Sequence, residues 1–475
     1  MGPTNEPTQT GPRWFTQSPA QLLIVSAGFS LATCAPGAND DNNESREVAQ
    51  LRQALQGLRY DEEALPNDPS NRVANNERAV VLGQRLFFDP SLSGPLIEGD
   101  NDGSDGTLGK QGEPGKVSCA SCHVPQGEFV DTRSPHGQIS LASMWTRRRT
   151  PSLLDVAFSP FFNWDGRHDS LWSQATGVIE SHVEFNSGRL FVATQIAEQY
   201  RADYEDLFSD LAALENETRF PRLPPEEAGC KEIVRSTGPE YVCRGKPGDG
   251  AEYDDMTSDD QRLTTEILVN VGKSLAAYVS QLRCGPSRFD SWLDGDELAL
   301  NGSEVRGAQL FAGDADCIAC HSGPLLTDGQ FHNVGLAPAT VAVAFTDLND
   351  RGAAEALPLL ENDEFNTQGV FSDGERAEIP AELGPELEGA FRTPGLRCLS
   401  EQPSFMHTGQ FKSLTSVLTF FNEGGHFVGY PGENELTPLG LNEQQLSDLA
   451  AFLRSLDGPG PDARWLEPPQ GIEHE

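Results

Sequence analysis

Two five-residue motifs constrain this chain more than any other feature of its sequence. Cys119-Ala120-Ser121-Cys122-His123 and Cys317-Ile318-Ala319-Cys320-His321 each place two thiols three positions apart, with a histidine directly after the second thiol. Two cysteines at this spacing reach both vinyl groups of a haem, and the histidine is then held against the iron. The sequence therefore predicts two covalently attached haem c groups, with His123 and His321 as the proximal iron ligands.

Two other chemistries use the Cys-x-x-Cys pattern. The four thiols could form one zinc site, alone or together with the two histidines, and a single pair could be a thioredoxin-like redox site. The histidine after each pair and the repetition of the motif disfavour zinc. Neither motif follows a βαβ pattern, which disfavours the redox pair.

The motifs lie in two copies of one helical unit. Gly83-Gln84-Arg85-Leu86-Phe87 precedes the first motif, and Gly307-Ala308-Gln309-Leu310-Phe311 precedes the second. Apolar residues at helical spacing predict a closing helix over Glu266–Leu282 and another over Asn442–Leu456. One helix crossing another around a Cys-x-x-Cys-His loop predicts a mainly α fold with two cytochrome c-like domains, each around one covalently bound haem c.

Composition and turn residues predict how the chain is divided. Residues 1–34 form a signal peptide, 35–75 a flexible linker, 76–262 the first haem domain, 263–460 the second haem domain, and 461–475 a tail. Within the first domain, residues 214–262 form an acidic excursion.

The N-terminus predicts export. Arg13 precedes the apolar run Leu22–Ala32, which is too short to span a bilayer. Cys34 follows directly, as in bacterial signal peptides whose cleavage leaves a lipidated cysteine. We expect a periplasmic or exported protein, which meets a membrane only through a lipid anchor at Cys34.

Four further cysteines remain outside the motifs. Cys230 and Cys243 flank a loop that contains glycine and proline, and they are natural partners. Cys284 and Cys398 then pair across the two domains. Spare cysteines in an exported chain indicate disulfides, and free thiols are the alternative.

The charge of the chain restricts its partners. Asp and Glu outnumber Lys and Arg by 72 to 34, so the formal net charge is −38. Such a field repels nucleic acid and anionic lipid, and it suits a cationic protein partner.

Further motifs resemble those of the bacterial di-haem cytochrome c peroxidase and MauG family. In chain order they are Leu86-Phe87-Phe88-Asp89, the first haem motif, Arg148-Arg149-Thr150-Pro151-Ser152-Leu153, Asn163-Trp164-Asp165-Gly166-Arg167, Glu180-Ser181-His182-Val183-Glu184-Phe185, the second haem motif, Phe331-His332-Asn333-Val334-Gly335, Phe391-Arg392-Thr393-Pro394-Gly395-Leu396-Arg397, His407-Thr408-Gly409 and Phe420-Phe421-Asn422-Glu423-Gly424-Gly425. Together they run through most of residues 77–458 in the order of the family.

The resemblance implies unequal roles for the two haems. The first would bind hydrogen peroxide, and the second would receive electrons. Trp164 matches the tryptophan that relays electrons between the haems. Glu184 matches the carboxylate that shuttles a proton during cleavage of the O–O bond, a step that needs a nearby acid or base. Gln174 matches a glutamine of the distal pocket.

Three positions depart from the family pattern. Phe421 stands where the peroxidases carry a methionine ligand and MauG-like members a tyrosine, and phenylalanine cannot bind iron. His426, Tyr430 and Met406 are the nearby substitutes. His136 is the candidate distal ligand of the first haem, although it lies closer to the motif than the family spacing.

The third departure concerns a cation. Arg149 replaces an asparagine of the calcium site that the family places between its domains. A guanidinium can take the place of a cation there, so the presence of calcium is uncertain.

Three functions fit these features, and we expect the first. A di-haem peroxidase would reduce hydrogen peroxide to water with electrons from a small cytochrome c or cupredoxin. A MauG-like enzyme would instead use peroxide to oxidise Trp or Tyr of a partner protein. A non-enzymatic electron-transfer cytochrome would need strong axial ligands on both irons. The resemblance also makes a homodimer conceivable.

Overall fold

The computed structural model describes residues 40–63, 66–133, 139–235, 238–338, 349–374 and 384–469. The chain divides into two compact units, Met1–Glu47 and Val48–Glu475, and apart from the first residues of one helix all that follows concerns the second unit. The predicted signal peptide, with Cys34, lies outside the described residues. No helix of the described segments is long and apolar enough to cross a membrane.

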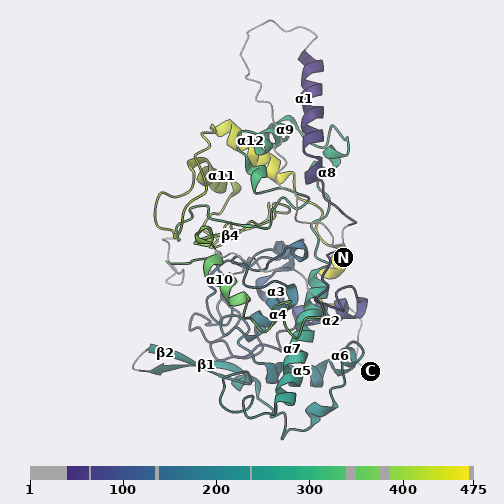
Figure 1. The fold of residues 1–475 in the computed structure, drawn as a ribbon, viewed down its shortest axis with the longest axis vertical. Helices are drawn as coiled ribbons and strands as arrows, with labels where there is room; N and C mark the ends of the chain where they lie inside the picture. The colour runs from purple at the N-terminus through teal and green to yellow at the C-terminus, as the bar shows by residue number, and fades with distance from the viewer. Residues whose placement is uncertain are drawn as a thin grey trace, which may run out of the picture. The chain divides into compact units, whose positions relative to one another are not determined.

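Helices dominate the described residues (Figure 1). They are α1 Asp40–Ala54, α2 Glu77–Phe88, α3 Cys119–Cys122, α4 Leu171–Glu180, α5 Arg189–Gln199, α6 Arg201–Glu205, α7 Ser258–Val279, α8 Arg288–Leu293, α9 Gly302–Ala312, α10 Ala353–Leu360, α11 Leu414–Glu423 and α12 Glu443–Arg454. The strands are β1 Gly229–Arg235, β2 Gly238–Arg244, β3 Phe331–His332 and β4 Phe391–Arg392. The prediction of a mainly α chain is confirmed.

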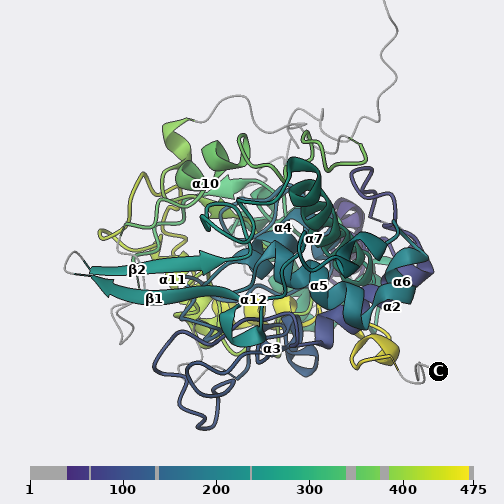
Figure 2. The ribbon, with the colours of Figure 1, turned by 90° about the horizontal axis from the view of Figure 1, so that it is seen from below.

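The first core forms where α2 and α7 cross, with α4 and α5 packed beside them (Figure 2). Gly83 permits this crossing, because a Cβ atom at its position would lie 1.9 Å from the backbone oxygen of Ser274 on α7. One turn later the Phe87 ring packs on Tyr278, with ring centroids 5.0 Å apart. A side chain at position 83 would therefore force the two helices apart.

The second core repeats this arrangement with α9 and α12. A Cβ atom on Gly307 would lie 2.1 Å from the backbone oxygen of Asp448. Phe311 packs on Phe452 at 5.2 Å between ring centroids, as Phe87 packs on Tyr278. The repeated Gly-x-x-Leu-Phe pattern is thus a repeated helix crossing, which confirms the duplicated unit.

The boundary between the two cores lies later in the chain than the sequence predicts. The expected boundary near residue 263 falls inside α7, which packs on α2, α4 and α5. Residues of α7, and Leu282 just after it, belong to the first core because their apolar side chains are buried there. Residues 263–282 therefore go with the first haem motif, and beyond them the chain enters the second core at α8.

The predicted linker and tail also differ from the structure. Within residues 35–75, Leu55 and Leu58 are buried in the second core, since these apolar side chains follow α1 directly. In the predicted tail, the backbone oxygen of Trp465 accepts a hydrogen bond from the Tyr278 hydroxyl, and its ring contacts the same tyrosine. Leu55, Leu58 and Trp465 are therefore packed against the fold rather than parts of a free linker or tail.

Both predicted disulfides are present. Cys230–Cys243 joins β1 to β2, which pair antiparallel with these two residues opposite each other. This hairpin extends away from the helices (Figures 1 and 2). Cys284–Cys398 connects the end of the first core to the second half of the chain. The two halves are therefore tied covalently as well as by packing.

Candidate haem sites

The first Cys-x-x-Cys-His motif presents a histidine that is ready to bind a metal. Cys119–Cys122 form the short helix α3, and His123 follows it. The His123 Nδ1 lies 2.9 Å from the backbone oxygen of Phe129, and burial lowers the pKa of the ring. A neutral imidazole that donates from Nδ1 keeps the Nε2 lone pair free. This is the tautomer that a proximal iron ligand requires.

The second motif repeats this geometry. The His321 Nδ1 lies 2.9 Å from the backbone oxygen of Leu326, and burial lowers its pKa. In each site the backbone of a proline also interacts with the histidine, Pro151 with His123 and Pro394 with His321. Each proline ends an Arg-Thr-Pro triplet.

The four motif cysteines are free thiols. Burial raises the pKa of Cys119, Cys122 and Cys317 to about 12, so these groups are protonated at neutral pH rather than reactive thiolates. They are available for two thioether bonds at each site.

A zinc site shared by the motifs finds no support among the described residues. Among these residues, one group has ligand atoms close enough together to hold a metal ion: Cys320, Asp328 and His332. This group contains no residue of the first motif. Both nitrogens of His332 are already taken, Nε2 by Asp328 at 2.9 Å and Nδ1 by Glu435 at 2.7 Å. The hydrogen bond to Asp328 is the largest cause that raises the pKa of His332, to about 11, so the ring is a cation and no ligand.

Two buried guanidiniums provide a test of whether haem fits. Arg149 and Arg392 open the two Arg-Thr-Pro triplets and are 5% and 8% exposed. Among the described residues no carboxylate accepts a hydrogen bond from either. Arg149 bonds Gln402 at 2.6 Å while its Nε has no partner, and Arg392 bonds the backbone oxygen of Asn163 at 3.3 Å.

Burial lowers the pKa of Arg149 and of Arg392 to about 10, which is still well above neutral pH, and the nearby Glu128 carboxyl, whose own pKa is raised to about 8, opposes the shift at Arg149. Buried charges require a counter-charge. Each haem carries propionate groups, and these anions would meet the requirement beside the two histidines. The residues present therefore fit two haem groups.

Trp164 lies between the two sites. Its indole Nε1 donates to the backbone oxygen of Arg149 at 2.7 Å, and its own backbone oxygen accepts from the Arg392 amide at 2.8 Å. Arg149 leads to Pro151 beside His123, and Arg392 leads to Pro394 beside His321. The buried tryptophan is thus bonded to both segments that support the proximal histidines.

An arginine clamp holds this junction together. Arg148 donates from Nε and Nη2 to Asp350 at 2.7 and 2.6 Å, and it also bonds Asp165, next to Trp164. All three side chains are nearly buried. Phe391 lies beneath the guanidinium at 5.2 Å, and His407 stacks on Phe391 at 3.7 Å between ring centroids.

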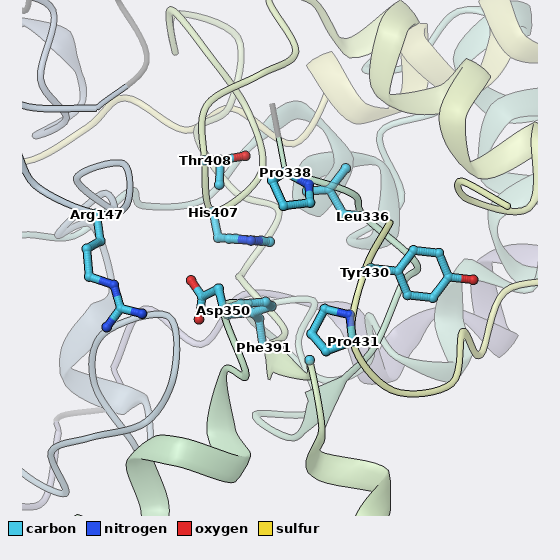
Figure 3. A pocket seen from close by; sticks show the side chains of 10 residues that line it. Arg147, Leu336, Pro338, Asp350, Phe391, His407, Thr408, Tyr430 and Pro431 are labelled. Atoms are coloured by element: carbon cyan, nitrogen blue, oxygen red, sulfur yellow. The ribbon is translucent and has the colours of Figure 1, made fainter. Parts of the chain in front are cut away.

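Asp350, Phe391 and His407 line a small pocket at this junction (Figure 3). Burial lowers the pKa of His407 to about 3, so its ring is neutral. Tyr430 lines the same pocket, but its hydroxyl points away from His407 (Figure 3).

The predicted proton shuttle lies beside the first motif. Burial raises the pKa of Glu184, although a hydrogen bond from Ser181 and the charge of Arg167 oppose the shift. The Glu184 carboxylate in turn raises the pKa of Cys119 and Cys122, so it lies close to both thiols. A carboxyl whose pKa is raised holds its proton to a higher pH than an exposed glutamate does, which suits a group that stores and passes on a proton.

Gln174 lies on the face of α4 that turns away from α7. Trp172 and Thr176 face α7, where a Cβ atom on Gly272 would lie 2.6 Å from the Trp172 backbone oxygen. Gln174, Gly177, Val178 and Ser181 share the opposite side at helical spacing, and this side is only half-buried. Gln174 and the Ser181–Glu184 pair therefore belong to one surface.

The face of α11 that carries Phe421 is apolar. Phe421 lies on α11 on the same face as Leu414, Val417 and Leu418, and this face packs into the second core. Phe421 offers no ligand atom. Among the substitutes, the His426 Nδ1 accepts from the Ala337 amide at 2.9 Å, so the hydrogen sits on Nε2 and neither nitrogen is free. Met406 packs against the second core. His136 lies outside the described residues.

Arg149 and Arg392 are a pair of functional candidates that the sequence motifs alone did not single out. The signal for them was available, because both begin an Arg-Thr-Pro triplet after a haem motif. Their significance depends on burial without a carboxylate, which only the fold reveals.

Comparisons with known proteins point to one family. Residues 77–223 match the profile of the di-haem cytochrome c peroxidases. The chain is 27% identical over 438 residues to the methylamine utilization protein MauG of Methylorubrum extorquens, covering 92% of each chain. It is 29% identical to the cytochrome-c peroxidase IdrP1 of Denitromonas iodatirespirans, covering 79% of this chain and 81% of that protein.

A solved structure shares the fold. The diheme peroxidase BthA from Burkholderia thailandensis superposes with a TM-score of 0.55 at 21% identity, over 87% of this chain and 95% of that one. With its two cores and its two Cys-x-x-Cys-His motifs, this chain belongs to the di-haem cytochrome c peroxidase and MauG family of haem-dependent oxidoreductases.

Proposed function

We propose that this protein is a periplasmic di-haem peroxidase that reduces hydrogen peroxide to water with electrons from a small cytochrome c or cupredoxin. The observation that carries the proposal is the position of Trp164, hydrogen-bonded to the backbone of both Arg149 and Arg392. The two sites are therefore joined by an aromatic side chain rather than isolated.

Peroxide reduction takes up two electrons and two protons for each molecule, and it yields two molecules of water. Haem, when bound, supplies the iron that binds peroxide and accepts single electrons. The protein supplies the rest. Glu184 holds a proton and passes it between the two peroxide oxygens, Gln174 lines the same surface, and Trp164 offers the route for electrons from the second site.

The net charge of −38 supports a cationic donor protein, because opposite charges speed up encounter. The test is steady-state turnover with a reduced basic cytochrome c and hydrogen peroxide at increasing ionic strength. Rapid donor oxidation that falls with salt is expected. Two low-spin haems that do not react with peroxide would instead identify a plain electron-transfer cytochrome.

A second candidate is a MauG-like enzyme, which would use peroxide to oxidise Trp or Tyr of a partner protein. Phe421 favours it, because the methionine of the peroxidases is absent and the face of α11 that carries Phe421 is apolar. The same assay separates the two. Fast reaction with peroxide and negligible oxidation of small donors would support this second candidate.

A further inference from the structure

His168 is a buried histidine in the first core that none of the steps above uses. It is 9% exposed, and its Nδ1 has no hydrogen-bond partner among the described residues. Burial, together with the charge of Arg167, lowers its pKa to about 3, so the ring is neutral. A buried N–H group without an acceptor is costly, so the unpartnered Nδ1 restricts where the hydrogen of the ring can sit.

A glycine brings the His168 ring onto α4. A Cβ atom on Gly177 would lie 2.8 Å from Cε1 and 2.9 Å from Nε2 of His168, but 3.9 Å from Nδ1. Glycine in the middle of a helix costs about 1 kcal/mol relative to alanine. Here it allows the Cε1–Nε2 edge of the imidazole to touch the helix backbone.

The contact point falls between the two predicted distal residues. Gln174 lies one turn before Gly177 on α4, and Ser181, which bonds the Glu184 carboxyl, follows one turn after. One helical turn rises about 5.4 Å. The Nε2 edge of His168 therefore lies on the same surface as Gln174 and Glu184.

The tautomer follows from the missing partner. A buried N–H group without an acceptor is rarer than an acceptor without a donor, so the hydrogen of the neutral ring resides on Nε2. We propose that His168 is a third member of the distal group with Gln174 and Glu184, and that its Nε2–H donates a hydrogen bond to an oxygen of the bound peroxide. The proposal rests on the proposed peroxidase function.

The test uses the oxidised holoprotein and two probes. Fluoride titration followed by visible absorption reports a hydrogen-bond donor at the first site without any turnover. Stopped-flow mixing with hydrogen peroxide reports the reaction itself. The variant His168→Phe keeps the ring but removes both nitrogens, and His168→Gln returns a donor. Gly177→Ala displaces the ring, and His182→Phe, whose ring packs on Tyr241 of the hairpin, is the matched control.

His168→Phe and Gly177→Ala are expected to weaken fluoride binding about tenfold and to slow the peroxide reaction roughly tenfold to a hundredfold. His168→Gln should recover part of both losses, and His182→Phe should match the wild type. Haem content and thermal unfolding identify a variant that has merely misfolded. If His168→Phe or Gly177→Ala misfolds, the fluoride affinity of His168→Gln tests the proposal instead.

Unchanged fluoride affinity in His168→Phe and Gly177→Ala would overturn the proposal. So would a change from low-spin to high-spin haem in His168→Phe, because His168 would then be an iron ligand. If the wild type binds fluoride through His168 but does not turn over peroxide, the proposed function fails while the assignment of His168 stands.

Discussion

The indole Nε1 of Trp164 donates a hydrogen bond of 2.7 Å to the backbone oxygen of Arg149, and the Arg149 amide donates one of the same length to the backbone oxygen of His407. A tryptophan of the first half is thereby connected to the second half through the backbone of a single residue, Arg149. The Arg148 clamp on Asp165 and Asp350 fixes the same junction. Electron sharing between the sites is therefore expected to depend on this contact.

Trp164→Phe should slow electron transfer from the second site to the first by roughly tenfold, equal to about 1.4 kcal/mol of barrier. The aromatic ring remains, but the hydrogen bond to Arg149 is lost. Stopped-flow reoxidation of the half-reduced protein by peroxide measures the rate. Trp145→Phe, which removes a different indole bond, to Asp100, is the control and should behave as the wild type. Equal rates in all three proteins would exclude Trp164 from the route.

Glu184→Gln should lower peroxide turnover roughly a hundredfold, within the usual range for removal of a general acid–base. The amide keeps the shape of the side chain but cannot carry the proton. Covalent haem content should not change, which a denatured haem spectrum verifies. The exposed Glu217 provides a control, Glu217→Gln. Normal turnover in Glu184→Gln would mean that another group moves the proton.

Phe421→Met should create an iron ligand on α11. The thioether would replace the ring on the apolar face shared with Leu414 and Leu418, and the oxidised protein should gain a low-spin, methionine-ligated haem in its absorption and magnetic spectra. Phe420→Met, one position away and packed against Phe411, should leave the spectra unchanged. A change in both variants, or in neither, would place the distal surface of the second site elsewhere.

Glu128 predicts how stability varies with pH. Burial, together with the charges of Asp457 and Glu401, raises its pKa from an ordinary value near 4.5 to about 8. Between these two values the unfolded chain ionises while the folded protein stays protonated, so stability falls as pH rises through this window and levels off above it. Glu128→Gln should remove this dependence and raise stability at pH 8 by roughly 1–2 kcal/mol.

Denaturant unfolding at pH 5 and pH 8 measures the effect. The difference between the two pH values should shrink in Glu128→Gln, while the exposed substitution Glu217→Gln should leave it as in the wild type. An unaltered pH dependence in Glu128→Gln would show that the carboxyl is ionised in the folded state.

Calcium removal is expected to leave activity and unfolding temperature unchanged. The Arg149 guanidinium is buried at the position where the family resemblance places a calcium ligand, and it already bonds Gln402. Assays with a chelator and with added calcium chloride check this, with Arg149→Asn as the comparison. Loss of activity on chelation in the wild type would show that the cation binds despite the arginine.

Local sequence patterns predicted the parts of the protein that depend on local rules. Gly83 and Gly307 open the same Gly-x-x-Leu-Phe pattern, and both mark a helix crossing because only glycine tolerates the opposing backbone. The spacing of each Cys-x-x-Cys-His motif similarly predicts a histidine with a free Nε2. Such features need few neighbours, so the sequence alone reveals them.

Features that depend on distant contacts could not be predicted. Leu55 lies before the first motif in the chain but is buried with the second core, and Trp465 returns to Tyr278 from a segment rich in proline. The orphaned Nδ1 of His168 and the unneutralised Arg392 depend on what is missing around a side chain. A sequence pattern does not show which side chains lack a partner in the folded protein.

The Cys284–Cys398 disulfide has a consequence for how the protein is made. It closes a loop of 114 residues, and Cys317 and Cys320 lie inside that loop. Eight cysteines outside Cys34 could be oxidised in about a hundred pairings, yet the finished protein needs four of them as thiols for haem. The machinery that matures this chain must therefore protect Cys317 and Cys320 from oxidation until haem attachment, because a premature bond to Cys284 would block a haem site and a domain link at once.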